Sequence, residues 1–261
     1  MKITLVQNHP EFGDREGNAA RLVKAMESSP SDLYILPELA YSGYQFTSAE
    51  EARGLAEGLD SPYIDLLRSA SRRLDACVVF GFPELESGRL YNSSLALLPD
   101  GTEHLYRKTH LFYREKLYFA PGNTGFRVFD FRGARIGMAI CFDWFFPESF
   151  RTLAMMGADI VAHSSNLVLP YCQKANFAAA VQNRIFIATA NRVGTEQRES
   201  EALVFTGGSV LVSPKGEYLL EGPANAEAIL TAEIDPKAAR NKSVNSWNEA
   251  FADRRPEHYR L

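Results

Sequence analysis

The sequence of 261 residues lacks the features of several specialised classes of protein. No apolar run approaches the ~20 residues of a membrane-spanning helix, which argues against a membrane protein. The net charge of -4 shows no basic excess, which argues against a nucleic-acid-binding protein. Residues 1–7 are too short and too strand-like for a signal peptide. We therefore expect a cytoplasmic protein whose partners include neither a membrane nor a nucleic acid.

Cysteine is scarce in this chain. Cys77, Cys141 and Cys172 make an odd number, in a protein too long to need disulfide bridges for stability. We therefore expect reduced thiols. No cluster of cysteine and histidine has the spacing of metal ligands, so the sequence predicts no metal site.

The composition is that of an ordinary globular protein with a sizeable core, since 46% of the residues are hydrophobic and 23% are charged. There is no low-complexity segment, tandem repeat or linker. We therefore expect a single domain over residues 1–261.

The spacing of apolar residues predicts strands that alternate with helices and are later joined by hairpins. The predicted strands are 3–7, 33–36, 77–82, 91–98, 103–107, 126–131, 134–141, 159–165, 185–190, 209–213, 218–220 and 228–234. The predicted helices are 18–26, 62–74 with Ser61 as its N-cap, 147–156, 173–183 and 236–241. This mixture indicates an α/β fold with layers rather than a purely parallel sheet.

One cysteine stands at a predicted turn that suits catalysis. The alternating stretch 135–140 predicts a strand that ends at Cys141, and Pro147 followed by an acidic residue predicts the first turn of a helix. A sharp strand-to-helix turn can expose a thiol beside free backbone N–H groups, as covalent catalysis requires. The competing interpretation is a buried structural cysteine, which is the commoner role for an isolated cysteine at the end of an apolar strand.

Two charged side chains stand at the ends of other predicted strands. Glu38 follows strand 33–36 and Lys108 follows strand 103–107, and ligand sites gather at strand ends of α/β sheets. Glu38 is the candidate general base, which takes the thiol proton and later activates water. Lys108 is the candidate that stabilises the oxyanion of a tetrahedral intermediate. Taken singly, Glu38 is more often a helix-initiating or surface carboxylate, and Lys108 is more often a solvated charge at a sheet edge.

Three further groups near these candidates bear on the chemistry. The backbone N–H of Phe142, next to the cysteine, is the natural second donor to an oxyanion. Glu115 could hold Lys108 or help position the substrate and the leaving amine, although its basic neighbours are typical of a charged loop. His110 is a competing partner for Cys141, but five histidines scattered singly give a Cys-His pair no support.

Three sequence motifs surround the three main candidates in a fixed order. They are LPELAYSGY at 36–44, YRKTHLF at 106–112 and ICFDWFFPE at 140–148. Together they resemble the glutamate, lysine and cysteine motifs of the carbon-nitrogen hydrolase (nitrilase) superfamily. Further similar segments are DIVAHSSN at 159–166, ANRVG at 190–194 and DRRPE at 253–257, so that the resemblance covers nearly the whole chain.

This resemblance implies a fold, a set of catalytic roles and a reaction. The fold is a four-layer α-β-β-α sandwich that pairs, through helices around the cysteine turn, into a homodimer or larger homo-oligomer. The triad is Glu38 as general base, Lys108 as oxyanion stabiliser and Cys141 as nucleophile, with Glu115 as a supporting glutamate and without a metal or organic cofactor. The reaction is hydrolysis of non-peptide C–N bonds through a thioester acyl-enzyme, with release of ammonia or an amine.

The residues after the cysteine bear on the substrate. Superfamily members that hydrolyse nitriles commonly carry Trp-Glu there, whereas this chain carries Phe142 and Asp143. This departure favours small amides or N-carbamoyl amines as substrates. The chain also resembles compact archaeal-type nitrilases, so that conversion of small aliphatic nitriles to acids and ammonia stays open. An acyltransferase with an amine acceptor also stays open, as does an inactive member that acts as a binding or scaffold protein.

We expect a small and partly aromatic substrate pocket. The candidates for its lining follow or flank the motif residues, and each could instead serve core packing; they are Tyr44, Phe112, Phe142, Trp144 and Asn166. No obvious carboxylate-clamping arginine lies in the motifs, which disfavours an anionic substrate, although Arg114 and Arg192 leave one open.

Overall fold

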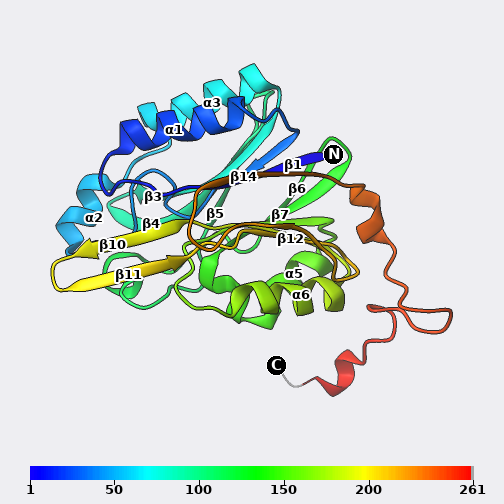
Figure 1. Cartoon of the computed structure of the whole chain (residues 1–261). Coiled ribbons are helices and arrows are strands. Elements are labelled where there is room, and N and C mark those ends of the chain that lie inside the picture. Colours follow the sequence, from blue (N-terminus) through cyan, green and yellow to red (C-terminus); the bar gives the residue numbers. More distant parts are fainter. Residues whose placement is uncertain (260–261) are drawn as a thin grey trace.

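Two six-stranded sheets lie face to face at the centre of the structure, a computed structural model that describes residues 1–259 (Figure 1). Helices cover the outer face of each sheet, which gives four layers in the order α-β-β-α. The four-layer sandwich predicted from the sequence motifs is therefore confirmed.

The first sheet combines the early strands of the chain with its last strand. Its order is β14-β1-β2-β3-β4-β5, with the bounds Ala228–Glu233, Lys2–Gln7, Leu33–Ile35, Cys77–Glu86, Arg89–Leu97 and Glu103–Arg107. Strands β1, β2 and β3 are parallel, while β4 is antiparallel to both of its neighbours. Because two antiparallel steps restore the direction, β5 runs parallel to β2 and ends at the same edge of the sheet.

The second sheet is built from the middle of the chain. Its order is β13-β12-β9-β8-β7-β6, with the bounds Tyr218–Glu221, Val210–Val212, Phe186–Ala190, Ile160–Ser164, Ala134–Ile140 and Val128–Phe131. Strands β7, β8 and β9 are parallel. Strand β6 pairs antiparallel with β7, β12 pairs antiparallel with β9, and β13 pairs antiparallel with β12.

Four longer helices form the outer layers. Helices α1 (Arg15–Glu27) and α3 (Pro62–Leu74) cover the first sheet, and α5 (Pro147–Met155) and α6 (Cys172–Asn183) cover the second (Figure 1). The hydroxyl of Ser61 accepts a hydrogen bond from the N–H of Tyr63, so the predicted N-cap of α3 is confirmed. The shorter helical segments are α2 (Ala49–Leu55), α4 (Glu115–Tyr118), η1 (Cys141–Phe145), η2 (Pro236–Arg240) and η3 (Pro256–His258).

Within residues 1–259, no helix combines the length and the apolar character needed to cross a membrane.

The central strands are apolar on both faces because both faces are covered. In β3, Cys77 and Val79 pack into the core between the two sheets, whereas Val78 and Phe80 pack against the helices of the first sheet. The strands of the second sheet divide their side chains in the same way. The result is three apolar layers, of which the middle one fixes how the two sheets sit on each other.

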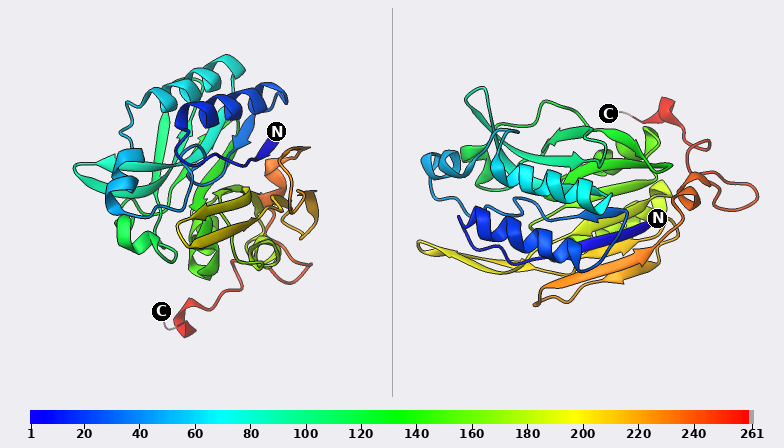
Figure 2. Two further views of the ribbon diagram at one scale, coloured as in Figure 1. Left: turned by 60° about the vertical axis from the view of Figure 1, so that its left-hand side comes forward. Right: turned by 90° about the horizontal axis from the view of Figure 1, so that it is seen from above.

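The sequence patterns do not predict the short helical segments α2, α4 and η3. They also do not predict the hairpin of β10 (Val193–Arg198) and β11 (Glu201–Thr206), which extends beyond the ends of the two large sheets (Figure 2). The hairpin was missed because β10 buries Val193 and the carboxylate of Glu196 rather than a row of alternating apolar residues. The short helix predicted over 236–241 is present as the 3₁₀ helix η2, which follows Asp235 as its N-cap.

The directions of the strands explain why the candidate residues converge. Glu38 follows β2 and Lys108 follows β5, at the same edge of the first sheet. Cys141 follows β7 and Asn166 lies just beyond β8, at one edge of the second sheet. The carboxyl ends of parallel strands meet at one edge, where loops can assemble a site.

The loop that carries Glu38 rests on the backbone of β3. The N–H of Gly81 donates to the carbonyl of Pro37, and the carbonyl of Gly81 accepts from the N–H of Ala40, both at 2.9 Å. A Cβ on Gly81 would lie only 2.5 Å from the Cα of Glu38. This close approach of two backbones requires glycine.

We expect Gly81→Ala to destabilise the protein by about 2 kcal/mol or more, because the added methyl group forces the Glu38 loop away from β3. The matched control is Gly54→Ala in α2, where a Cβ meets no atom within 4 Å. That change should be neutral or raise the free energy of unfolding by up to about 1 kcal/mol. Urea unfolding measures both variants, and equal losses of stability would contradict the packing argument.

Candidate active site

Cys141 sits at a sharp turn between β7 and a helix. It is the first residue of η1, and α5 begins soon afterwards at Pro147. Its φ is +38°, in the left-handed region that residues other than glycine adopt at a cost in energy. The strand-to-helix turn expected from the sequence is present, with one 3₁₀ segment between the strand and the helix.

A buried histidine holds the backbone of this turn. His163 Nε2 lies 2.9 Å from the carbonyl oxygen of Cys141, and Nδ1 lies 2.9 Å from Thr189 Oγ1. Burial lowers the pKa of His163 to about 4, so the ring is neutral at physiological pH. Because a carbonyl only accepts, Nε2 carries the proton and Nδ1 accepts from the threonine hydroxyl. Asn176 in turn donates to Thr189 Oγ1 at 2.7 Å, which completes the chain.

A buried carboxylate holds the other side of the turn. Asp143 is fully buried and accepts hydrogen bonds from the N–H of Ile140 at 2.9 Å and from the hydroxyl of Tyr106 at 2.7 Å. It also accepts from His110 Nδ1 at 2.8 Å, so His110 pairs with Asp143 rather than with the thiol. Asp143 therefore acts within the turn, and any effect on the choice of substrate reaches the pocket indirectly.

Glu38, Lys108 and Glu115 form a buried cluster of charges. Lys108 Nζ donates to Glu38 Oε1 at 2.6 Å and to Glu115 Oε1 at 2.8 Å, and the three side chains are at most 3 % exposed. Asn92 Nδ2 also donates to Glu38 Oε1, at 2.7 Å. The second carboxylate oxygen, Glu38 Oε2, is buried and has no hydrogen-bond partner within residues 1–259. It is therefore free to accept a proton or a ligand.

Burial and charge set the protonation of this cluster. Burial raises the pKa of Glu38 more than the charge of Lys108 lowers it. Burial lowers the pKa of Lys108, but the charges of Glu115 and Glu38 raise it by more, which keeps the ammonium charged. Burial, together with the charge of Glu38, raises the pKa of the Cys141 thiol well above its usual value. The thiol is therefore protonated at rest, and its attack needs a base.

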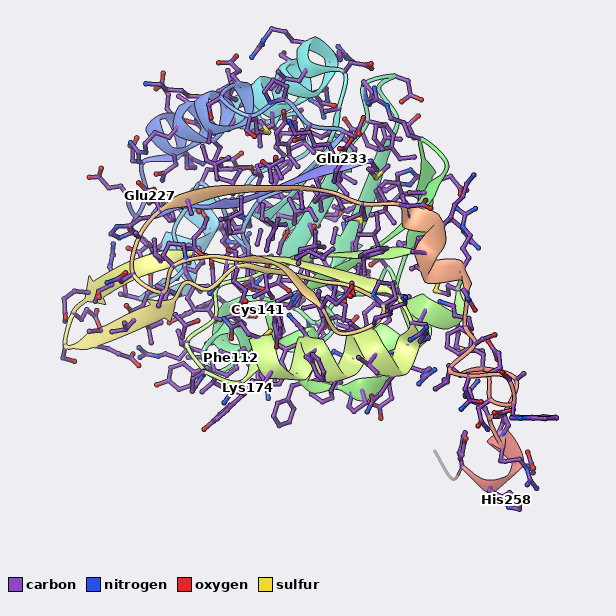
Figure 3. All side chains as sticks on the ribbon, turned by 45° about the vertical axis from the view of Figure 1, so that its right-hand side comes forward. Phe112, Cys141, Lys174, Glu227, Glu233 and His258 are labelled. Carbon is purple, nitrogen blue, oxygen red and sulfur yellow. The ribbon has the colours of Figure 1, made fainter. Side chains whose placement is uncertain are left out.

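A small pocket opens onto the thiol of Cys141. Four predicted lining residues are found in its wall with Cys141, namely Phe112, Phe142, Trp144 and Asn166; the rest of the wall is Leu167, Val168 and Leu169. Cys141 and Phe112 are labelled in Figure 3, near α6. The side-chain amide of Asn166 is buried, and neither its nitrogen nor its oxygen has a partner in the part of the chain described. This amide is available to a ligand.

Tyr44 lies elsewhere than expected. It lines a neighbouring cavity with Glu115 rather than the pocket at Cys141, and its hydroxyl donates to Glu115 Oε1 at 2.6 Å. Burial and the charge of Glu115 raise the pKa of Tyr44 well above its usual value, so the hydroxyl keeps its proton. Glu115 is thus held between Tyr44 and Lys108, and it is the one buried residue of the short helix α4 rather than part of an exposed charged loop.

The sequence interpretation missed two polar groups of the site, Asn92 and His163. Both stand in strands that are otherwise buried, β4 and β8, and both are themselves fully buried. A polar residue in an apolar strand was the available signal, since buried polar groups must find partners. Among residues 1–259, no group of three His, Cys, Asp or Glu side chains is arranged to hold a metal ion.

The whole chain is similar to proteins of one family. The sequence profile described as carbon-nitrogen hydrolase matches residues 2–242. A nitrilase of Pyrococcus abyssi is 41% identical over 99% of both chains. An (R)-stereoselective amidase of Pseudomonas sp. is 37% identical over 92% of this chain and 88% of its own length. An N-carbamoylputrescine amidase of Solanum tuberosum is 30% identical over 93% of this chain and 87% of its own.

A solved structure is similar in fold as well. It is a variant of the amidase from Nesterenkonia sp. AN1, in which acrylamide has added to the active-site cysteine. The TM-score is 0.78 at 26% identity, over 93% of this chain and 96% of the other. A cysteine of that protein thus reacts covalently with a small amide.

The buried histidine predicts a dependence of stability on pH. The folded pKa of His163 is about 4, below the ordinary value of 6.5, so the unfolded chain takes up a proton between these values that the folded chain does not. The free energy of unfolding should therefore fall as pH decreases from 6.5 towards 4, with a contribution from His163 of about 2 kcal/mol at pH 5.

Substitution separates this contribution from those of the other titrating groups. Gln at position 163 keeps an N–H donor for the carbonyl of Cys141 but does not titrate. Urea unfolding of wild type and His163→Gln at pH 7 and pH 5 measures the difference. Identical losses of stability in the two proteins would show that His163 does not titrate as inferred.

Proposed function

Since the chain belongs to the carbon-nitrogen hydrolase family, and is thus a hydrolase as its motifs suggest, we propose that it hydrolyses small amides or N-carbamoyl amines with Cys141 as nucleophile. The observation that carries the proposal is the ammonium of Lys108, which is buried between two carboxylates and lies close enough to Cys141 for these charges to act on the pKa of the protonated thiol. A base, an oxyanion stabiliser and a nucleophile therefore stand in one small site.

The first half of the reaction forms the thioester. Glu38 takes the proton of the Cys141 thiol through its free oxygen while sulfur attacks the carbonyl carbon. Lys108 has three N–H donors and uses two on carboxylates, so the third can donate to the developing oxyanion together with the N–H of Phe142. Glu38 then returns its proton to the leaving nitrogen, and ammonia or an amine departs.

The second half hydrolyses the thioester. Glu38, again unprotonated, removes a proton from a water molecule that attacks the acyl carbon. Lys108 and the N–H of Phe142 stabilise the second oxyanion as they did the first. The tetrahedral intermediate collapses with release of the acid, and the sulfur regains its proton from Glu38. Glu115 keeps Lys108 charged and in place through both halves.

The lining of the pocket argues for a small, uncharged acyl group. Its wall combines aromatic and aliphatic side chains with the amide of Asn166, which has no hydrogen-bond partner within residues 1–259, and neither Arg114 nor Arg192 belongs to this wall. A carboxamide presents one acceptor and two donors, which complement the donor and acceptor of Asn166. The relatives named as amidases and as N-carbamoylputrescine amidases support this class of substrate.

A second candidate function is hydrolysis of small nitriles. It is favoured by the 41% identity to a protein named nitrilase. The same thiol would attack the nitrile carbon, and Lys108 would then face nitrogen instead of oxygen. An acyltransferase would use an amine in place of water at the second step. The complete set of Glu38, Lys108 and Cys141 argues against an inactive binding or scaffold protein.

Removal of the thiol tests the proposal. Cys141→Ala should lower turnover of amides by at least about 10³-fold, since the covalent route is lost. The matched control is Cys172→Ala, which removes a buried thiol outside the pocket wall and should keep most of the activity. Ammonia release from a panel of amides, ureido compounds and nitriles measures turnover. Undiminished turnover in Cys141→Ala would refute the proposed nucleophile.

The same panel separates the amidase from the nitrilase and the acyltransferase. Mass spectrometry of an acyl adduct at Cys141 gives the mass of the acyl group. Adducts formed from nitriles alone would favour the nitrilase, and an N-acyl product formed with added amines would favour the acyltransferase.

We propose further that residues 1–261 act as one domain and that two copies pair through the face formed by α5 and α6. Large apolar side chains stand exposed on and beside these helices: Phe145, Met155, Met156, Tyr171 and Phe177, each at least 41% exposed. Exposed apolar groups that gather on one face are typical of an interface between proteins.

Substitution on this face tests the pairing. Met155→Glu with Phe177→Glu should shift the protein from dimer or larger assembly to monomer in analytical ultracentrifugation, because a charge would be buried at the contact. Leu66→Glu is the control, since Leu66 is 41% exposed on α3 at the opposite outer layer. A wild type that sediments as a monomer would contradict the proposed interface.

A further inference from the structure

A second buried carboxylate lies on β10, outside the catalytic cluster. Glu196 is 5% exposed and accepts hydrogen bonds from the backbone N–H groups of Tyr44, at 3.0 Å, and Gln45. Arg192 Nη1 donates to Glu196 Oε2 at 2.6 Å. One carboxylate therefore joins the β10–β11 hairpin to the backbone at the end of the glutamate motif.

The partner arginine also holds the ring of Tyr44. Arg192 is fully buried, and its guanidinium lies 3.9 Å from the centre of the Phe205 ring. Phe205 packs edge-to-face against Tyr44, with 5.8 Å between the ring centres. Glu196 thus holds the backbone of Tyr44, and Arg192 holds its ring through Phe205.

Tyr44 connects this unit to the catalytic charges. Its hydroxyl donates to Glu115 Oε1 at 2.6 Å, and the same oxygen accepts from Lys108 Nζ at 2.8 Å. Lys108 Nζ donates in turn to Glu38 Oε1. The series of contacts runs without a gap from the hairpin to the general base.

We propose that Glu196 and Arg192 are positioning residues, which set Tyr44 so that its hydroxyl holds Glu115 and, through it, Lys108. This inference rests on the proposed function, in which Lys108 must be held in place to stabilise the oxyanion. A buried ion pair adds little to stability compared with apolar residues of equal volume, whereas its directed hydrogen bonds specify one geometry. Glu196 makes such directed hydrogen bonds, since its oxygens accept from the N–H groups of two consecutive residues and from the guanidinium of Arg192.

A double-mutant cycle tests the route through Tyr44. The variants are Glu196→Gln, Tyr44→Phe and the two combined. The first readout is the rate at which iodoacetamide alkylates Cys141, followed by intact mass as a function of pH. Lys108 lowers the pKa of the thiol, so a displaced Lys108 should move the alkylation profile to higher pH. The second readout is kcat and KM for whichever amide turns over.

We expect each single variant to lower alkylation at pH 7 and kcat by about 10-fold, with KM changed by less than about 2-fold. In the Tyr44→Phe background, Glu196→Gln should lower the alkylation rate and kcat by less than about a further 2-fold, because the hydrogen bond from Tyr44 to Glu115 is already absent. Effects that multiply in the double variant would overturn the proposal. A Glu196→Gln protein with an unchanged profile would also overturn it.

Controls separate positioning from loss of fold. Arg198→Gln alters the same strand, where Arg198 pairs with Glu51 and stacks on Phe12, and it should leave the profile unchanged. Thermal unfolding of every variant identifies loss of fold. If Glu196→Gln does not fold, Glu196→Asp enters the same cycle, because it keeps the charge beside Arg192 and shortens its reach. The alkylation readout needs no substrate, so a failure of the proposed reaction stays distinguishable from a failure of this inference.

Discussion

The site depends on one ammonium group buried between two carboxylates. Lys108 contacts Glu38 and Glu115 at 2.6 and 2.8 Å, and water reaches none of the three appreciably. Removing charges from water is costly, and close hydrogen bonds in good geometry are what offset the cost. The surrounding polar structure supplies that geometry, because Asn92 fixes one carboxylate and Tyr44 fixes the other.

The proposed nucleophile, Cys141, belongs to the second sheet, whereas Lys108 and its two carboxylates belong to the first sheet and its loops. The first sheet and its loops carry the charges, while the second carries Cys141 and Asn166. Between them lies a closely packed apolar layer, which resists sliding of one sheet over the other. The distance between thiol and base is therefore set by the core of the sandwich, and the turn at Cys141 is adjusted locally by His163 and Asp143.

Much of the fold follows from local patterns, because alternation of apolar residues is a local property of a strand. The patterns predict the large-sheet strands and the four longer helices, with small differences at their ends. They do not predict β10, whose inward residues include a carboxylate, and they give no sign that Glu115 is buried. A charged residue is expected to be exposed until its partners are known, and one partner of both Glu196 and Glu115 is Tyr44, which lies 152 and 71 residues away.

The sequence by itself determined the fold family, and it determined that Glu38, Lys108 and Cys141 stand at strand ends. Both follow from the order of the motifs and the spacing of apolar residues, which are properties of the linear sequence. Only the tertiary structure decided which hydrogen bonds join these residues to one another and to the rest of the site. Glu38 and Lys108 are 70 residues apart, and Tyr44 and Glu196 are 152 apart. Hydrogen bonds across such separations depend on how sheets and loops pack, which no local pattern contains. For the same reason only the structure shows that the hydroxyl of Tyr44 donates to Glu115.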